Sequence, residues 1–271
     1  MPKTPSNPPT SPPTSAGRPG VHLLLSEPLR AAGEYLSLML SSRSRVTPGD
    51  GHPVVIFPGL ASDARAIGPL LSHCQSLGYA AMDWGQGWNL GPRGNLDDWL
   101  KQLASQVRSQ LGKGAGAPSL IGWSLGGLYA RELAKRRDWP IRQVISIGTP
   151  FNGAPEQTHA GRLYGLLSGQ PVSMSTELAL RLRTPPPVPT TSIYSRADGI
   201  VAWQACRHEK ESALVQDVEV QGSHLGMGWN PQVLDLVADR LLQSPGDWKR
   251  HQACNARPTD QSGRACRSFQ V

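Results

Sequence analysis

A serine between glycines, placed where a strand pattern meets a helix pattern, restricts the fold of this chain most. Residues 122–126 read Gly-Trp-Ser-Leu-Gly, after a short apolar run at 118–121 and before a helical pattern at 127–134. A sharp turn there strains the backbone of Ser124, so side chains at the flanking glycines would crowd the strand and the helix. The helix N-terminus would direct N–H groups toward charge developing at the serine. The alternative is a glycine-rich turn with a surface serine.

Strand and helix patterns alternate through most of the chain. The expected strands are 53–57, 79–83, 118–123, 141–147, 191–195 and 214–220, and the expected helices are 63–77, 96–111, 125–137 and one starting near 230. This alternation predicts an α/β fold with a mainly parallel central sheet flanked by helices. The length of 271 residues suits one such domain, which we place at 50–245.

Both ends of the chain differ in composition from this domain. Residues 1–20 are rich in Pro, Ser and Thr and predict a disordered tail, and residues 246–271 form a polar tail that we expect to be loosely ordered. Residues 21–46 predict a peripheral amphipathic helix that packs on the domain, with a membrane-facing helix as the alternative. The apolar residues at helical spacing are Leu29, Tyr35, Leu36, Leu38 and Leu40.

An insertion at 151–190 interrupts the alternation. It holds helical stretches near 160–168 and 175–183 and follows a strand of the sheet. At that place an insertion lies above the carboxyl edge of the sheet, so we expect a small helical cap over the site. The side chains expected to line an apolar acyl pocket are Leu163, Tyr164, Leu166, Leu167, Met174, Leu178 and Leu180. The alternative, that these leucines only attach the cap to the body, remains open.

An acid and a base follow the serine in the chain order of a catalytic triad. Asp198 comes in a turn just past the strand at 191–195, at the edge where α/β sheets place their chemistry. His224 follows the last expected strand. We therefore expect Ser124 to attack an acyl carbonyl, His224 to take its proton, and Asp198 to orient the imidazole.

The alternatives to this acid and base have weaker positions. Asp198 could be a structural turn aspartate before glycine, and Asp217 is the second candidate for the acid, although it lies within a strand pattern. The remaining histidines lie near the ends of the chain, before a strand, inside a helix, in the insertion or too close to the acid loop; they are His22, His251, His52, His73, His159 and His208.

An oxyanion hole is expected at the loop after the first strand. The chain turns at 58–60, and we assign the backbone N–H groups of Leu60 and Leu125 as donors. Gly59 would let the backbone approach the substrate closely. An ordinary strand-to-helix turn explains the same residues equally well.

Taken together, these segments resemble the α/β-hydrolase fold family, of the bacterial esterase/lipase type. The matching segments are 57–60, 84–92, 121–127, 147–153, 194–201 and 222–231, within a region covering most of 50–245. The resemblance implies a serine hydrolase acting on carboxylic esters. One departure is Pro58-Gly59, where many lipases carry His-Gly.

Composition narrows the expected partners. The formal net charge is +7, but the basic residues are scattered, so we expect no nucleic-acid binding. Weak attraction to anionic lipid surfaces stays open. No signal-peptide pattern or membrane-span length is found, so we expect a cytoplasmic protein without membrane insertion. We expect no cofactor and no metal, and the sequence does not indicate an oligomeric state.

The four cysteines have no metal-type C-x-x-C spacing. Cys74 is expected as a buried thiol on the first helix of the domain. Cys254 and Cys266 lie in the tail, where they would pair only in an oxidising compartment.

Three function classes follow from this site. The preferred one is an esterase or lipase using a Ser-His-Asp triad and an acyl-enzyme intermediate. An acyltransferase or thioesterase would use the same triad, with another acceptor competing with water. A binding protein that kept the fold without chemistry is disfavoured because all three triad residues are present.

Overall fold

The computed structural model describes residues 18–41, 47–153 and 175–252. In these residues six strands form one parallel sheet in the order β2-β1-β3-β4-β5-β6. The strands are β1 (Pro53–Phe57), β2 (Ala80–Asp83), β3 (Ser119–Trp123), β4 (Gln143–Ile147), β5 (Thr190–Tyr194) and β6 (Val215–Glu219). The α/β fold expected from the alternation is confirmed. Because all six strands are parallel, their carboxyl ends share one edge of the sheet.

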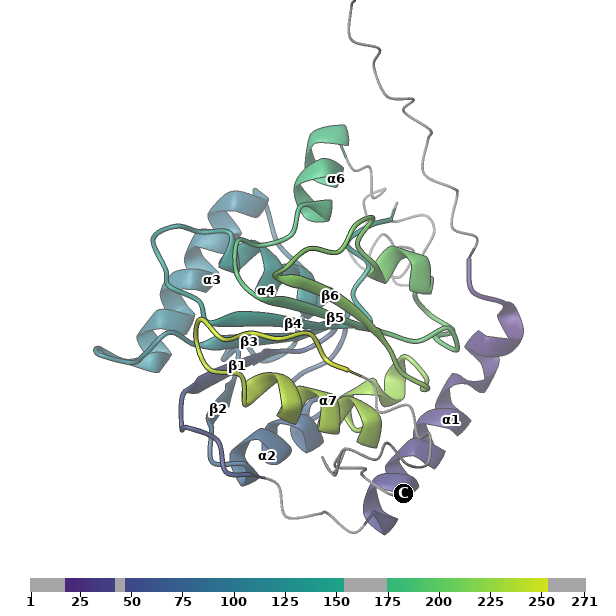
Figure 1. The fold of residues 1–271 in the computed structure, drawn as a ribbon. Coiled ribbons are helices and arrows are strands. Elements are labelled where there is room, and N and C mark those ends of the chain that lie inside the picture. The colour runs from purple at the N-terminus through teal and green to yellow at the C-terminus, as the bar shows by residue number, and fades with distance from the viewer. Residues whose placement is uncertain (1–17, 42–46, 154–174, 253–271) are drawn as a thin grey trace, which may run out of the picture.

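Helices cover both faces of this sheet (Figure 1). One face packs against α2 (Gly68–Ser76) and α7 (Pro231–Leu241), and the other against α3 (Leu96–Leu111) and α4 (Leu125–Ala134). The central strands carry apolar side chains toward both helix layers; Val54 and Ile56 join one buried cluster, while Val55 joins the other. Burial on both faces explains why β1 reads as a continuous apolar run instead of an alternating one.

Local signals set where several helices begin. Asn95 caps α3 by accepting from the backbone N–H groups of the first turn, and Asn230 caps α7 in the same way. The expected start of the first domain helix at 63 was wrong, because α2 begins at Gly68. A proline stands in the first turn of α2, where its missing N–H costs nothing and its ring cannot disturb a preceding turn.

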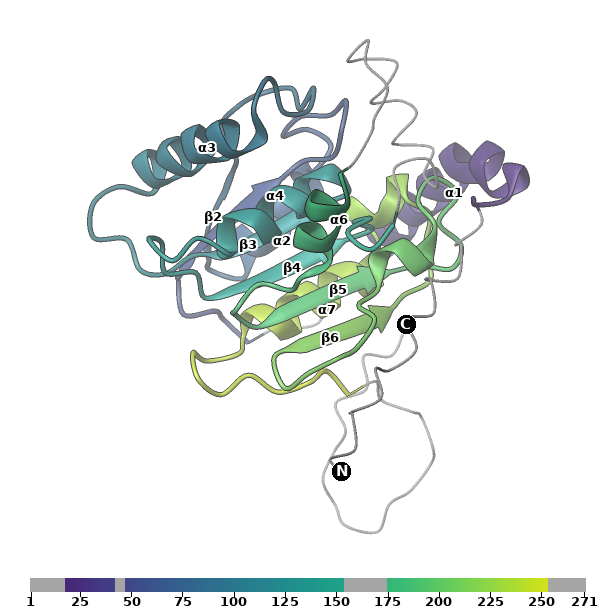
Figure 2. The ribbon, with the colours of Figure 1, turned by 90° about the horizontal axis from the view of Figure 1, so that it is seen from above.

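Helix α1 (Val21–Leu40) lies along the side of the domain and contacts the segment before α7 (Figures 1 and 2). The helix packs on the domain, but of the apolar residues at helical spacing only Leu38 is buried, whereas Leu29, Tyr35, Leu36 and Leu40 are exposed. Glu27 is buried instead, at 1% exposure. Periodicity identified the helix but not its inward face, because polar contacts to loops hold that face. None of the described helices is long and apolar enough to cross a bilayer.

The segment expected to form a cap, 151–190, is described only at 151–153 and 175–190. Helix α6 (Thr176–Arg183) is attached to the layer of α3 and α4 by Arg181, which donates to Glu132 and Asp97. Leu180 on this helix is exposed. Several expectations fall outside the described residues. They concern residues 1–17 of the tail expected at 1–20, Cys254 and Cys266, and the expected pocket residues Leu163, Tyr164, Leu166, Leu167 and Met174. Cys74 is buried and unpaired with another cysteine, and burial raises its pKa to about 12.

Candidate active site

Ser124 occupies the turn between β3 and α4 with a strained backbone. Its φ of 53° and ψ of −122° lie in a region that side chains disfavour. Glycine is needed on both sides of it: a Cβ at Gly122 would lie 2.4 Å from the backbone of Gly127, and one at Gly126 would lie 2.3 Å from the Phe57 carbonyl oxygen. The small residues therefore allow the tight turn that carries the serine hydroxyl.

A line of hydrogen bonds connects Ser124, His224 and Asp198. His224 Nε2 lies 3.0 Å from Ser124 Oγ, and His224 Nδ1 lies 2.6 Å from Asp198 Oδ2. A carboxylate can only accept, so Nδ1 carries the proton and Nε2 is left to accept from the serine hydroxyl. All three residues are at most 5% exposed. The structure thus brings together the three residues that the sequence pattern singled out.

Strand ends position the acid and the base. Asp198 follows β5, and its Oδ1 accepts from the N–H groups of Ile200 and Val201 at 2.8 and 2.7 Å. His224 follows β6 and precedes the short helix η3 (Leu225–Gly228). Trp123 Nε1, at the end of β3, donates to the His224 carbonyl oxygen over 3.1 Å. Both loops reach Ser124 because β3, β5 and β6 end at the same sheet edge (Figure 2).

The electrostatic surroundings favour a charged form of His224. Burial opposes the imidazolium, but the Asp198 carboxylate outweighs it through its charge and its hydrogen bond, with a further contribution from Glu27. The pKa of His224 is therefore raised above its ordinary value. An imidazole with a raised pKa accepts the serine proton more readily.

The loop after β1 lies against the serine. A Cβ at Gly59 would lie 3.3 Å from Ser124 Cβ, which is a tight contact, so glycine at this position eases the close approach of the loop. Among the described residues, the two non-glycine positions with positive φ are Ala61 and Ser124. These positions adjoin Leu60 and Leu125, the two residues assigned as oxyanion donors. Leu125 is also the first residue of α4, where N–H groups lack helical partners.

Asn89 fixes this loop and was not identified as a site residue from the sequence. It is fully buried, and its Nδ2 donates to the Pro58 carbonyl oxygen over 2.8 Å. Its backbone carbonyl accepts from the N–H of Ala61, also at 2.8 Å. A polar residue within the glycine-rich segment at 84–92 was the available signal, but its partner is 31 positions away.

Asp217, the second candidate for the acid, lies in a separate cluster. Its Oδ1 is 2.6 Å from His208 Nδ1, and His208 Nε2 accepts from Arg131 at 2.9 Å. Burial and the guanidinium lower the pKa of His208, although the hydrogen bond that its Nδ1 donates to Asp217 opposes the shift. Among the described residues, the partner of this second histidine at Nε2 is Arg131 and not a serine.

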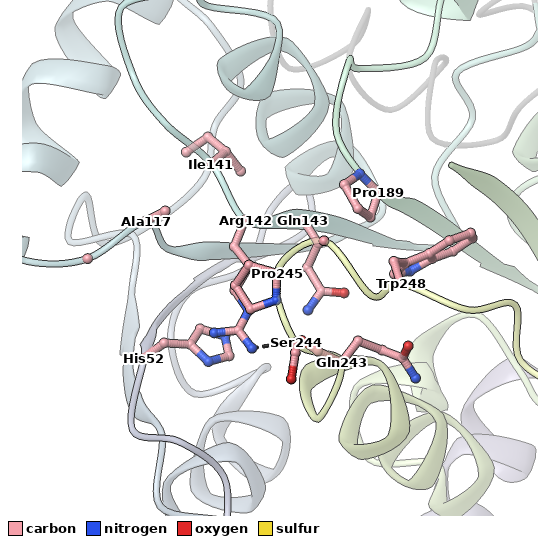
Figure 3. Close-up of a pocket in the computed structure, with 12 residues that line it drawn as sticks. His52, Ala117, Ile141, Arg142, Gln143, Pro189, Gln243, Ser244, Pro245 and Trp248 are labelled. Atoms are coloured by element: carbon pink, nitrogen blue, oxygen red, sulfur yellow. Dashed lines mark hydrogen bonds between the residues drawn. The ribbon is translucent and has the colours of Figure 1, made fainter. Parts of the chain in front are cut away.

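A hollow of about 330 Å³ lies at the opposite edge of the sheet (Figure 3). Residues that precede or begin strands line it, including Ala117, Gln143 and Pro189. Arg142 in its wall is held by Asp50 and by the Gln243 carbonyl oxygen. The hollow is therefore remote from Ser124, and the hydrogen-bonded line at the carboxyl edge is the better candidate for an active site.

Part of this chain is similar in sequence to known proteins. A pimeloyl-[acyl-carrier protein] methyl ester esterase from Legionella pneumophila is 27% identical over 99 residues, which is 36% of this chain and 38% of the relative. The chain thus matches little more than a third of the length of these curated relatives.

Solved structures show the same fold. The Pyrococcus furiosus esterase Pf2001 superposes with a TM-score of 0.51 at 14% identity, covering 75% of this chain and 93% of the esterase. A structure from the metagenome-derived lipolytic enzymes LipS and LipT gives a TM-score of 0.50 at 13% identity, covering 72% and 93%. The family model of lecithin:cholesterol acyltransferase matches residues 18–223, which is more than half of the chain. The chain belongs to the lecithin:cholesterol acyltransferase family, within the α/β-hydrolase fold.

Proposed function

We propose that this protein is a serine hydrolase that cleaves carboxylic esters through Ser124, His224 and Asp198. The observation that carries the proposal is the line of contacts from Asp198 through His224 to Ser124, on a strained strand-to-helix turn. That turn has the features of a nucleophile elbow. Family membership supports acyl chemistry at this site.

In the first half of the reaction, Ser124 Oγ attacks the acyl carbonyl carbon while His224 Nε2 takes the hydroxyl proton. The tetrahedral intermediate collapses when the same nitrogen returns the proton to the leaving alcohol, and an acyl-enzyme remains. Water then attacks the acyl-enzyme, with His224 again as the base. Asp198 holds the imidazole in the required tautomer and stabilises its cation.

The oxyanion of both intermediates would be bound by the backbone N–H groups of Leu60 and Leu125. Asn89 keeps the Leu60 loop against Ser124, so the donors need no reorganisation when charge develops. Loss of one such donor typically costs about 10²- to 10³-fold in turnover.

Covalent labelling tests this proposal most directly. A fluorophosphonate should modify Ser124, and Ser124→Ala should lose the label and the hydrolysis of nitrophenyl esters. Peptide mapping of the labelled protein identifies the residue. A label on another residue, or an active Ser124→Ala variant, would contradict the assignment.

Acyl transfer is the second candidate, because the matching family model describes an acyltransferase. The same acyl-enzyme would then pass its acyl group to an alcohol or thiol instead of water. Product analysis with a nitrophenyl ester, with and without added acceptor, separates the two. Acceptor-dependent ester or thioester product in excess of free acid would favour transfer.

A lipid ester is the substrate class that we propose. Helix α1 exposes a set of large apolar side chains beside the site, which suits contact with a lipid surface. The exposed residues are Val21, Leu25, Leu29, Tyr35, Leu36, Met39 and Leu40. Co-sedimentation with anionic vesicles should fall when Leu25, Leu29 and Leu36 are changed to serine, and unchanged sedimentation would exclude this role for α1.

A further inference from the structure

We propose that Glu27 of α1 is a positioning residue that holds the acid loop and the base loop together at the correct distance from Ser124. The proposal rests on the proposed function, since it assigns roles to Asp198 and His224. It concerns a residue that lies outside the sheet and outside the loops that carry the site.

A single carboxylate oxygen contacts both loops. Glu27 Oε1 accepts from the backbone N–H of Gly199 at 2.7 Å and from that of His224 at 3.0 Å. Its other oxygen, Oε2, accepts from the N–H of Leu225 at 3.0 Å. Gly199 adjoins the acid Asp198, whereas the other two donors are the base and its neighbour. Glu27 thus ties the backbones of both loops to one point.

The hydrogen bonds to the Glu27 carboxylate are strong because this carboxylate is buried. Glu27 is 1% exposed, and its hydrogen bonds are charge-assisted bonds shielded from water. A buried carboxylate is costly unless it is hydrogen-bonded, and here three backbone N–H groups and Arg30 donate to it. Removing the charge would leave loop N–H groups without their acceptor, so the loops would lose a defined position.

Glycines in both loops lie where α1 approaches them closely. A Cβ at Gly199 would lie 2.5 Å from the backbone of Leu23, one turn before Glu27. A Cβ at Gly226 would lie 2.2 Å from Glu34 Oε2. Glycine at position 199 allows the α1 backbone to approach the acid loop closely, and Gly226 leaves room for the Glu34 carboxylate beside the base loop.

Two further polar residues of α1 extend the same contact along one helix face. Arg30 donates to Glu27 and to the carbonyl oxygen of Ala197, the residue before Asp198. Glu34 accepts from the backbone N–H of Ser223, the residue before His224, at 2.6 Å. The polar face of α1 therefore holds the residues on both sides of the acid and the base.

The charge of Glu27 also acts on the imidazole. In the part of the chain that the structure describes, Asp198 from the acid loop and Glu27 from α1 are the charged groups that raise the pKa of His224. Facing Glu27 itself are Arg30 of its own helix and His224 of the base loop. Replacing the carboxylate by an amide should therefore lower the pKa of His224 as well as loosen the loops.

Glu27→Gln in the full chain tests the proposal. The amide has one acceptor and turns an NH₂ group toward backbone donors. Misplacement of reacting groups by about 1 Å can cost about 10²-fold, so we expect kcat for a nitrophenyl ester to fall by about 10- to 100-fold, with KM changed less than about twofold. The imidazole proton resonances of His224, followed by NMR, should titrate at lower pH than in the wild type.

Glu27→Asp separates charge from reach. The shorter side chain keeps the negative charge but cannot contact both loops at once. We expect the titration of His224 to stay closer to the wild type than in Glu27→Gln, while kcat still falls. This second variant also keeps the proposal testable if the glutamine variant folds poorly.

Glu132→Gln is the matched control. Glu132 is another buried glutamate, at 4% exposure, and its partners are Lys135 and Arg181 instead of the site loops. We expect it to lower thermal stability without moving kcat or the titration of His224. Equal losses of kcat in Glu27→Gln and Glu132→Gln would reduce Glu27 to a structural residue and overturn the proposal.

The two proposals can fail separately. If the wild-type protein is neither labelled by a fluorophosphonate nor active on esters, the proposed function fails. If the wild type is active and Glu27→Gln keeps its kcat and the titration of His224, the positioning role fails alone.

Discussion

Two buried histidine–aspartate pairs share the same contact in this protein but differ in the third partner. Both histidines have Nδ1 at 2.6 Å from a carboxylate oxygen, of Asp198 for His224 and of Asp217 for His208. Both therefore hold the proton on Nδ1. At Nε2, His224 meets a serine hydroxyl, whereas His208 meets the guanidinium of Arg131.

The third partner decides what each nitrogen can do. A hydroxyl can give up its proton to Nε2, so His224 can act as a base. A guanidinium keeps its proton near neutral pH even though burial lowers the pKa of Arg131 to about 10. A second proton on His208 would also face this cation. Burial and the Arg131 cation lower the pKa of His208, whereas Asp198 and Glu27 raise that of His224 against the effect of burial.

A histidine beside an aspartate is therefore insufficient to identify an active site. The second pair connects β6, the loop after η2 (Trp203–Cys206) and α4, and Arg131 stacks 3.7 Å from the ring of Phe151. It behaves as a link between elements, with its charges paired inside the protein. Variants of the two pairs should consequently affect different quantities.

The largest expected difference is in turnover. Asp198→Asn should lower kcat by about 10⁴-fold, because the amide donates to Nδ1 and leaves the proton on the nitrogen that faces Ser124. Asp217→Asn should lower it by less than about tenfold, since His208 contacts no reacting group. Steady-state kinetics on a nitrophenyl ester measures both. A large loss in Asp217→Asn with a small one in Asp198→Asn would exchange the roles.

For the free energy of unfolding, we expect Asp217→Asn to cause a larger loss than Asp198→Asn. Asp217 accepts from the ring and the backbone N–H of His208 within a buried cluster that includes Arg131. Breaking a buried charged network costs about 3–5 kcal/mol, so Asp217→Asn should lower the free energy of unfolding by an amount near this range. Urea denaturation provides the measurement. A loss below about 1 kcal/mol would mean that the cluster adds little to stability.

The pH dependence of catalysis should depend on His224 alone. The base must be neutral to accept a proton, so kcat/KM should rise with pH through the pKa of His224, with a midpoint above the ordinary 6.5. His208→Asn should leave the midpoint of this rise in kcat/KM unchanged. A midpoint that moves in His208→Asn, or a rate independent of pH between about 5 and 8, would contradict the assignment.

The smallest effect is the pH dependence of folding. His208 has a lowered pKa, so the unfolded chain binds more protons and the contribution of His208 to stability is lost as pH falls from 6.5 through the folded pKa. His224 has a raised pKa, so its contribution is present below 6.5 and lost as pH rises through the folded pKa.

The sign difference can be measured by comparing each asparagine variant with the wild type. Differences in unfolding free energy should amount to about 1.4 kcal/mol per unit of pKa difference. The difference for His208→Asn should grow as pH rises, whereas that for His224→Asn should shrink. If the two differences in unfolding free energy changed with pH in the same direction, the pKa values of the two histidines would be shifted in the same direction.

Short-range patterns sufficed for the fold and for the positions of Ser124, Asp198 and His224. The apolar runs of the strands, the asparagine caps and the glycines beside Ser124 act within a few residues, so they can be read in order along the chain. Parallel strands then bring their carboxyl ends to one edge, which explains why residues after β5 and β6 were expected near Ser124.

Long-range contacts account for what the sequence did not reveal. His208 was set aside as a base, and Asp217 was kept as an alternative acid, but only the tertiary structure pairs them with each other. The inward face of α1 was likewise misjudged, since Leu29, Leu36 and Leu40 are exposed while Glu27 is buried. Hydrophobic periodicity cannot predict a helix face that is held by hydrogen bonds to loops.

The sequence by itself determined which elements form, because propensity, capping and turn geometry depend on neighbours in the chain. The tertiary structure decided which polar groups meet: Glu27 reaches the backbone of His224 across 197 positions. A sequence pattern does not distinguish a buried carboxylate from a solvent-exposed one. They differ only in whether the fold surrounds the group with donors and excludes water, and that depends on the packing of distant segments.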